Sequence, residues 1–393
     1  MKSPFFVVMM KEIVENLRDT RTLLSSIVTG ALLGPVIFTV MINVVVGMQQ
    51  DKAQSALEMP VQNIAGAKSF KTFLEQQGVE LIEVGGSAEE IIQKKEHDAV
   101  LRIGDNYAED FAAGNPAKVE LYYDRSAKGA ANVTVRRIRG LVNQYSQSIG
   151  ATRLQLRGIS PSITQAVVIE NHDTSTSQSR GAQMMAFLPY ILMLGLFMGS
   201  TYLAIDTTAG EKERNSLEPL LLNPAKRSKI LSGKLAATFM FGALTLVLTL
   251  IAFVVSKNYL PMDELGMKLV LGIKQVSVLL LVLLPVALLA SALQTIVATF
   301  SKTFREAQTY VNLLIFIPMI PSIALMILPI KEKLWMMAVP ILGQNVVINQ
   351  LIRGESIDPI GLVLVVLSTL LVGLLLAWVA VRLYNRESLL FSD

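Results

Sequence analysis

Long stretches without a charged side chain alternate with polar segments along this chain, and they predict helices that cross a membrane. Crossing the hydrocarbon core takes about 20 mostly apolar residues, and six stretches reach that length with few polar positions. The predicted fold class is therefore an α-helical integral membrane protein with six transmembrane helices. The predicted spans are residues 22–47, 184–205, 235–256, 275–301, 307–330 and 359–381.

A seventh charge-free stretch, residues 334–352, differs from the other six. It contains Pro340, Gly343, Asn345 and further amide side chains that a single membrane helix would have to bury. Irregular backbone at membrane depth is tolerated where it faces protein or a water-filled cavity. We therefore predict a re-entrant or external helical element here rather than a seventh span.

The segment 48–180 is polar and long enough to form a domain of its own. Its short apolar runs alternate with helical patterns, which is typical of an α/β unit, and the stretch 172–180, rich in Ser and Thr, reads as a tether to the second span. Helices are predicted at 67–77, 88–95, 107–113 and 127–153, and strands at 79–84, 99–103, 118–123 and 165–170.

The N-terminal residues 1–21 predict an amphipathic helix. Phe6, Met10, Ile13 and Leu17 recur at helical spacing and form an apolar stripe, which is the pattern of a helix lying along a membrane surface. The opposite face carries charged residues, namely Lys11, Glu12, Glu15 and Arg18.

Composition supports a membrane protein and excludes several kinds of site. Hydrophobic residues make up 52% of the 393 residues and charged residues 17%, and there is no Cys to form a disulfide or a thiolate metal site. No phosphate-binding loop of the G-x-x-x-x-G-K-[ST] type occurs, so any ATP hydrolysis must belong to another chain. His97 and His172 stand alone in polar surroundings, so no metal site and no catalytic residue are predicted, and nucleic-acid binding is not indicated.

The distribution of Lys and Arg predicts the orientation. With six spans and both termini inside, the cytoplasmic segments hold fourteen Lys and Arg residues and the two short external loops hold six. Positive charge close to a span favours the cytoplasmic side. The segment 48–180 is then extracytoplasmic, and the segment 206–234 and the tail 382–393 are cytoplasmic.

The cytoplasmic segment 206–234 carries an ordered alternation of charge and leucine. Its charged residues are expected on a wet face, while Leu217, Leu220 and Leu221 form an apolar strip suited to docking on another protein. The residues expected on the wet face are Glu211, Glu213, Arg214 and Glu218, and Lys212 lies among them in the sequence.

These residues resemble the Glu-Lys-Glu-Arg-x-x-x-Glu-x-Leu-Leu pattern that permeases of the ABC-2 superfamily carry after their second span. The order of elements over nearly the whole chain is similar to the group that includes the sodium-extruding NatB-type permeases. That resemblance implies a bacterial inner-membrane exporter subunit, with residues 211–221 as a coupling helix and the N-terminal helix as a connecting helix.

The resemblance also implies partners: two copies of an ABC ATPase subunit, which hold the ATP and Mg²⁺, and a second permease copy or a close paralogue. No cofactor is expected in this chain. Sodium is the implied substrate, with drugs, peptides or lipids as alternatives.

Polar residues inside the spans are candidates for lining a pathway, although each could instead bond a neighbouring helix. They are Asn43, Gln294, Thr295 and Asn312. The six spans as drawn contain no titratable side chain, which argues against a proton-coupled carrier. A membrane-anchored sensor is the other alternative, and it would not need six spans or the charged, leucine-bearing segment.

Overall fold

The structure, a computed structural model, divides the chain into two compact units. The helical unit comprises Met1–Val46 and Thr174–Asp393, and the α/β unit comprises Gly47–Asp173. The predicted strand 165–170 and the tether 172–180 lie outside the described residues. Those residues are 3–20, 28–54, 57–124, 130–164, 185–217, 219, 224–261, 271–328 and 330–384.

Six helical stretches among the described residues are long and apolar enough to cross a membrane, as the sequence predicted. The first joins a π-helical turn, η1 (Val28–Leu32), to α3 (Leu33–Gln54). The others are built from α9 (Leu188–Ile205) with η4 (Asp206–Gly210) and α10 (Glu211–Glu213), α12 (Arg227–Ser256), α13 (Ile273–Phe300), α14 (Phe304–Leu313) with α15 (Phe316–Ile327), and α18 (Pro359–Tyr384).

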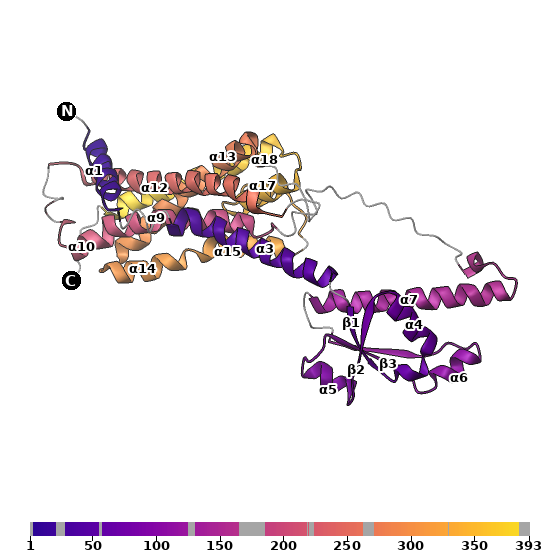
Figure 1. The fold of residues 1–393 in the computed structure, drawn as a ribbon. Helices are drawn as coiled ribbons and strands as arrows, with labels where there is room; N and C mark the ends of the chain where they lie inside the picture. Colours follow the sequence, from indigo (N-terminus) through magenta and orange to yellow (C-terminus); the bar gives the residue numbers. More distant parts are fainter. Residues whose placement is uncertain are drawn as a thin grey trace. The chain divides into compact units, whose positions relative to one another are not determined.

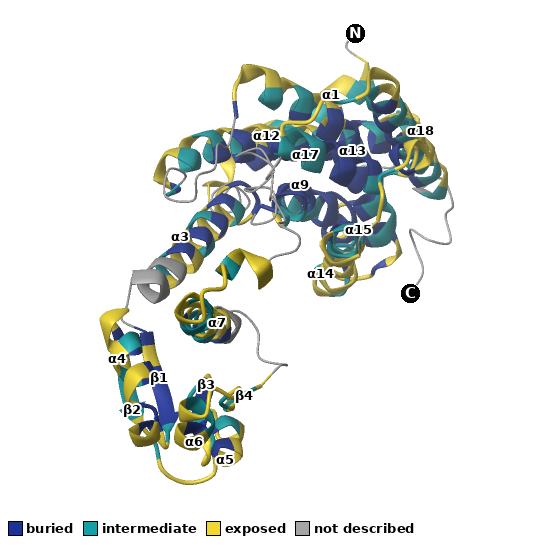
Figure 2. Ribbon diagram, turned by 90° about the vertical axis from the view of Figure 1, so that its right-hand side faces the viewer, coloured by how far each residue is buried: buried dark blue, intermediate teal, exposed yellow. Residues whose placement is uncertain are grey.

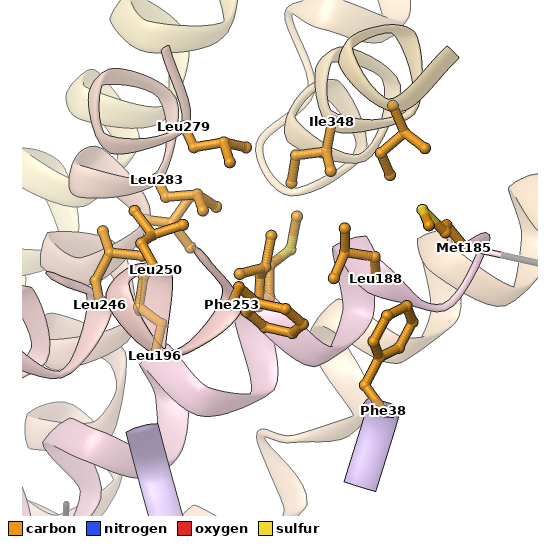
Figure 3. Close-up of a cluster of buried hydrophobic side chains, with 14 of the residues drawn as sticks. Phe38, Met185, Leu188, Leu196, Leu246, Leu250, Phe253, Leu279, Leu283 and Ile348 are labelled. Carbon is orange, nitrogen blue, oxygen red and sulfur yellow. The ribbon is translucent and has the colours of Figure 1, made fainter. Parts of the chain in front are cut away.

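Helices α9, α12 and α13 pack side by side at the centre of the helical unit (Figure 1). Of the most apolar stretch of Leu188–Glu213, 67% is buried, against 17% for Phe304–Ile327, so α9 is central and α14–α15 peripheral (Figure 2). Leucine and phenylalanine side chains from several helices fill the space between them (Figure 3). Phe38, for example, meets Phe253 edge to face at a centroid distance of 5.7 Å.

Small residues allow three of these elements to approach at backbone distance. A Cβ atom added to Gly30 would lie 2.9 Å from Thr245 Cγ2 and 3.0 Å from Gly199 Cα, and one added to Gly195 would overlap the Gly30 carbonyl. Gly195 and Gly199 stand four residues apart on α9. This spacing of small residues is the one that membrane helices use for close packing.

We expect Gly199→Ala to destabilise the helical unit. An added Cβ atom would overlap the Thr245 side chain, and overpacking of this kind costs about 1–3 kcal/mol. Gly47→Ala is the matched control, because a Cβ there meets no atom within 4 Å. Thermal unfolding in detergent should show a lower midpoint for Gly199→Ala and an unchanged or slightly higher one for Gly47→Ala.

The fifth span is interrupted between α14 and α15. The break falls at Leu314 and Ile315, one turn before Pro318. Pro318 has no N–H to offer the Leu314 carbonyl, and its ring crowds that carbonyl, so the helix cannot run straight through. Tighter bonds replace the missing one, with the Ile317 N–H donating to the Leu314 carbonyl at 3.1 Å.

The stretch 334–352 forms two helices, α16 (Leu334–Met337) and α17 (Leu342–Arg353), with a break between them. Two of its amides, Gln344 and Asn345, are buried and hydrogen-bonded. Asn345 Nδ2 donates to the Ile341 carbonyl at 2.8 Å, Ser322 Oγ donates to Asn345 Oδ1 at 2.7 Å, and Gln344 Nε2 donates to Thr369 Oγ1 at 2.7 Å. These hydrogen bonds offset the free-energy cost of burying the two amide side chains.

The α/β unit is built on a four-stranded sheet of order β2-β1-β3-β4. β1 is parallel to β2 and β3, and β4 is antiparallel to β3. The strands are β1 (Leu57–Gln62), β2 (Val79–Glu83), β3 (Ala99–Ile103) and β4 (Val119–Tyr123), and the helices are α4 (Lys68–Gln76), α5 (Ala88–Gln93), α6 (Tyr107–Ala112) and α7 (Ala130–Leu156).

Alternation along the strands sends side chains to two apolar clusters on opposite faces of the sheet. Leu101 packs in a cluster with residues of α4, α6 and α7, while the adjacent Val100 packs with residues of α5. The predicted helices and strands that lie in the described residues are present within a few residues. β1 was not predicted, although it is central, because Pro60 interrupts its pattern and argues against a central strand.

Candidate functional site

The charged segment after the second span begins as a continuation of that span. Helix α9 runs through the π-helical turn η4 into α10, and the chain then leaves the helix at Arg214. Asn215 adopts a left-handed conformation with φ of 55°, which asparagine tolerates better than most residues. The predicted span ended at residue 205, whereas the helix continues to Glu213 because its charged end is paired, as described next.

Glu211 and Lys234 form a buried ion pair between α10 and α12. The Lys234 ammonium contacts Glu211 Oε2 and donates to the Thr207 carbonyl at 3.0 Å. Lys234 is 1% exposed and Glu211 is 7% exposed. The expectation that Glu211 lies on a wet face is therefore corrected. Helix α12 begins at Arg227, two turns before residue 235. The span had been predicted to begin at residue 235 because Lys234 interrupts the charge-free stretch.

A third charge comes from the N-terminal helix α1 (Pro4–Arg18), which packs against α12. A Cβ added to Gly233 would lie 2.8 Å from the Phe5 carbonyl, so the two helices are in close contact there. Glu12 is buried at this interface, whereas Phe6, Met10 and Leu17 of the predicted apolar stripe are exposed. The sequence pattern predicts Glu12 on the charged face of the helix, opposite the apolar stripe. In the structure, the side of α1 that carries Glu12 packs against α12.

Burial raises the pKa of Glu12, and the positive charges of Lys234 and Lys11 oppose that shift without cancelling it. Lys11 Nζ lies 3.2 Å from Glu12 Oε1. We call Glu12, Glu211 and Lys234 the buried charge cluster. It joins α1, α10 and α12, and removing Lys234 would leave two buried carboxylates without their cation.

The raised pKa of Glu12 predicts a pH dependence of stability. Because the folded state binds the Glu12 proton more tightly than the unfolded state, where the pKa is near 4.5, stability falls as pH rises from about 4.5 through the folded pKa. Glu12→Gln should remove this contribution. Thermal midpoints of the two proteins should converge at acid pH, with Glu12→Gln the more stable at neutral pH. A constant difference across the pH range would contradict this assignment.

Two neighbouring residues attach the same segment to α13 and α14. Glu213 Oε2 accepts the Phe304 N–H at 2.6 Å, at the N-terminus of α14, where a negative charge is favoured by the helix dipole. The Lys212 ammonium donates to the Thr299 carbonyl near the end of α13. Arg214 pairs with Asp206 Oδ1 at 2.9 Å and so closes the turn onto η4.

Leu217 points into the protein rather than away from it. It is 3% exposed and packs with Leu231 of α12 and Ala380 of α18. The prediction that Leu217 belongs to an outward docking strip is corrected, because the bundle supplies its apolar partners. Glu218, Leu220 and Leu221 lie outside the described residues. Among the described residues of 211–221, those that are exposed are residues 213–216 and Pro219.

Two comparisons with known proteins cover most of the chain. The family model for ABC-2 family transporter proteins matches residues 25–382. The chain belongs to the ABC-2 transporter family. It is also 28% identical over 360 residues to the "ABC transporter permease protein NatB" of Bacillus subtilis (strain 168), covering 89% of each chain.

As an ABC-2 transporter, the chain is a multi-pass membrane protein and a permease subunit, and the family implies association with an ABC ATPase subunit. Glu211, Glu213 and Lys234 lie inside the matched region, whereas Glu12 precedes it. Sequence reasoning missed Glu12 and Lys234 as partners. The sequence did contain one indication. Lys234 lies within a helical apolar pattern of Ile230, Leu231 and Leu235, which indicates a buried lysine that needs an acidic partner.

The four candidate pathway residues of this ABC-2 chain have different surroundings. Gln294 is buried and bonds α13 to α9, with Nε2 donating to the Phe197 carbonyl at 2.8 Å and Oε1 accepting from Ser200 Oγ at 2.8 Å. Thr295 is buried and donates to the Ser291 carbonyl at 2.7 Å. Gln294 therefore bonds two helices together, whereas the Thr295 hydroxyl bonds within its own helix.

Asn43 and Asn312 are exposed in the helical unit. Asn43 Nδ2 donates to the Tyr259 carbonyl at 3.0 Å and so ties α3 to the turn that follows α12. Asn312 stands in the last turn of α14, on the side that carries Gln308 and Thr309. Of the four candidates, Asn312 has the setting that best suits contact with something outside the subunit.

Proposed function

We propose that this ABC-2 permease is half of an ATP-driven exporter, and that residues 211–217 receive force from the ABC ATPase subunit. The observation that supports it most directly is the attachment of this segment. Its exposed tip, residues 213–216, is held by neighbouring side chains that bond or pack against α12, α13, α14 and α18. A push on the tip would therefore reach four helices at once.

The attachments differ in what they transmit. The Glu211–Lys234 pair and Leu217 hold the segment to α12 and α18, which fixes it to the bundle. Glu213 holds the N-terminus of α14, whose far end is the break at Leu314 and Ile315. Hinges are a few residues at element ends that absorb backbone change. Movement of Glu213 would then swing α14 about this break while α15 stays packed.

The direct test of ATPase docking uses the exposed tip. Ser216→Trp places a bulky ring on the proposed contact, and Ser160→Trp in the α/β unit is a matched exposed control. Affinity purification with the cognate ATPase subunit should recover less ATPase with Ser216→Trp, by about tenfold, and the usual amount with Ser160→Trp. Equal recovery from both variants would refute docking at residues 213–216.

A second permease copy, with a second ATPase, is part of this proposal. Gln308, Thr309 and Asn312 are exposed on one side of α14, at i, i+1 and i+4. Polar groups at membrane depth are costly against lipid and are normally found facing protein or water. A second copy covering this side, with a hydrated pathway between the copies, would supply hydrogen-bond partners for these polar side chains.

Sodium is the substrate we propose, on the resemblance to sodium-extruding permeases. Neutral oxygen atoms of hydroxyl, amide and carbonyl groups would have to coordinate it along the pathway, with Asn312 at its edge. Proteoliposomes that contain the permease and its ATPase should move radioactive sodium in an ATP-dependent manner. Full ATPase activity with no movement of sodium would refute sodium as the substrate but would still be consistent with an exporter of another substrate.

We place the chain in the inner membrane of a bacterial cell with both termini in the cytoplasm and the α/β unit outside. The chain has no Cys, so single cysteines report position without background. An impermeant thiol reagent on intact cells should label Ser160→Cys and spare Ser216→Cys. The reverse pattern would overturn the orientation and the coupling role together.

A further inference from the structure

The α/β unit contains a groove between α7 and the loop that joins α6 to β4. Its volume is about 430 Å³, within the range of about 300–1,000 Å³ of small-molecule sites. One face of α7 forms one wall and the loop around Gly114 the other. The groove lies entirely in this unit and takes no part in the coupling described above.

Aromatic rings line the groove and are held in place. Tyr107 and Phe111 stack with centroids 5.7 Å apart, and Phe111 and Tyr145 stack at 6.4 Å. Tyr145 also packs on Phe70 at 4.8 Å, and its hydroxyl lies 2.8 Å from Ser69 Oγ. Because these contacts fix the rings, the apolar wall of the groove is preformed.

Gly150 keeps the groove open. It stands inside the 27-residue helix α7 and lines the groove, and a Cβ added there would meet no atom within 4 Å. Glycine inside a helix costs about 1 kcal/mol relative to alanine. Gly150 has no close neighbour and no left-handed backbone conformation that would require glycine. The effect of glycine here is that no side chain occupies this part of the groove.

Arg153 supplies a positive charge at the same groove. Its guanidinium lies 4.8 Å from the centroid of the Phe111 ring, and it donates to the Phe111 carbonyl at 2.8 Å and the Gly114 carbonyl at 3.2 Å. These bonds fix the guanidinium but leave its charge without a carboxylate partner in the part of the chain that the structure describes. Arginine forks are suited to carboxylates.

We propose that this groove binds an organic carboxylate with a flat apolar body, its charge at Arg153 and its body against the rings of Tyr107, Phe111 and Tyr145. The rings supply the apolar surface, the space beside Gly150 admits the ligand, and the guanidinium selects the anion. Such a site would make the α/β unit a receptor for an amphipathic acid, independently of what the helical unit transports.

Equilibrium dialysis of the full-length chain in nanodiscs tests this proposal, with empty nanodiscs correcting for partition into lipid. The probes are phenylbutyrate, its neutral amide, and decanoate, which carries the same charge on an aliphatic chain. Gly150→Leu fills the groove and favours the helix. Gly140→Leu, on the same helix but away from the groove and also in open space, is the matched control.

Phenylbutyrate should bind the unmodified chain and Gly140→Leu alike, and at least about tenfold more tightly than its amide. Gly150→Leu should weaken binding by about tenfold or more, and Arg153→Met should abolish the preference for acid over amide. Stronger binding of decanoate than of phenylbutyrate would overturn the flat-body assignment. No saturable binding to the unmodified chain, or equal binding by Gly140→Leu and Gly150→Leu, would overturn the site.

Discussion

Lys234→Met should be among the most destabilising single substitutions in the helical unit. It removes the positive charge that Glu211 contacts and that lies close to Glu12, and both carboxylates are buried. Removing one partner of a buried ion pair costs about 3–5 kcal/mol, because the remaining charge stays buried and unpaired. Thermal unfolding in detergent should show a large fall in the midpoint, and the yield of monodisperse protein should fall with it.

A matched substitution and a rescue separate this effect from loss of lysine packing. Lys229→Met makes the same change at an exposed position of α12 and should leave the midpoint nearly unchanged. Adding Glu211→Gln to Lys234→Met should recover part of the lost stability, since an uncharged amide is less costly to bury than a lone carboxylate. If the double variant is less stable than Lys234→Met alone, Lys234 does not stabilise the fold by neutralising the buried carboxylate of Glu211.

Glu213→Leu should uncouple ATP hydrolysis from the permease while leaving the fold intact. The carboxylate of Glu213 accepts the Phe304 N–H at 2.6 Å and is otherwise exposed. A hydrogen bond to a charged group contributes about 1.5–3 kcal/mol. If the force on the segment reaches α14 through this bond, the ATPase rate that depends on the permease should fall by about tenfold or more.

Glu213→Gln is the control, because its amide oxygen can still accept the Phe304 N–H after the charge is lost. It should retain most of the ATPase rate of the reconstituted complex, with the ATPase subunit bound in both variants. The coupling role of Glu213 is refuted if Glu213→Leu matches the unmodified complex. Loss of ATPase binding would instead assign Glu213 to the docking surface.

The polar face of α1 shows why helical periodicity did not identify every buried residue. The pattern correctly gave an amphipathic helix with Phe6, Met10 and Leu17 on one side, and these side chains are exposed as a membrane-surface helix requires. It could not show that Glu12 is buried on another side. Burial of Glu12 depends on Lys234, which lies more than two hundred positions away in the chain.

The sequence by itself determined the six spans, most of the α/β elements and the family. Those features follow from the length of apolar runs, from local periodicity and from a contiguous motif, all of which are properties of neighbouring residues. Only the tertiary structure decided that Glu211 and Leu217 face inward, that Gln294 bonds α13 to α9, and that Arg153 meets an aromatic groove. The physical reason is that the cost of burying a charge or an amide depends on its partners, and those partners come from distant segments that folding brings together.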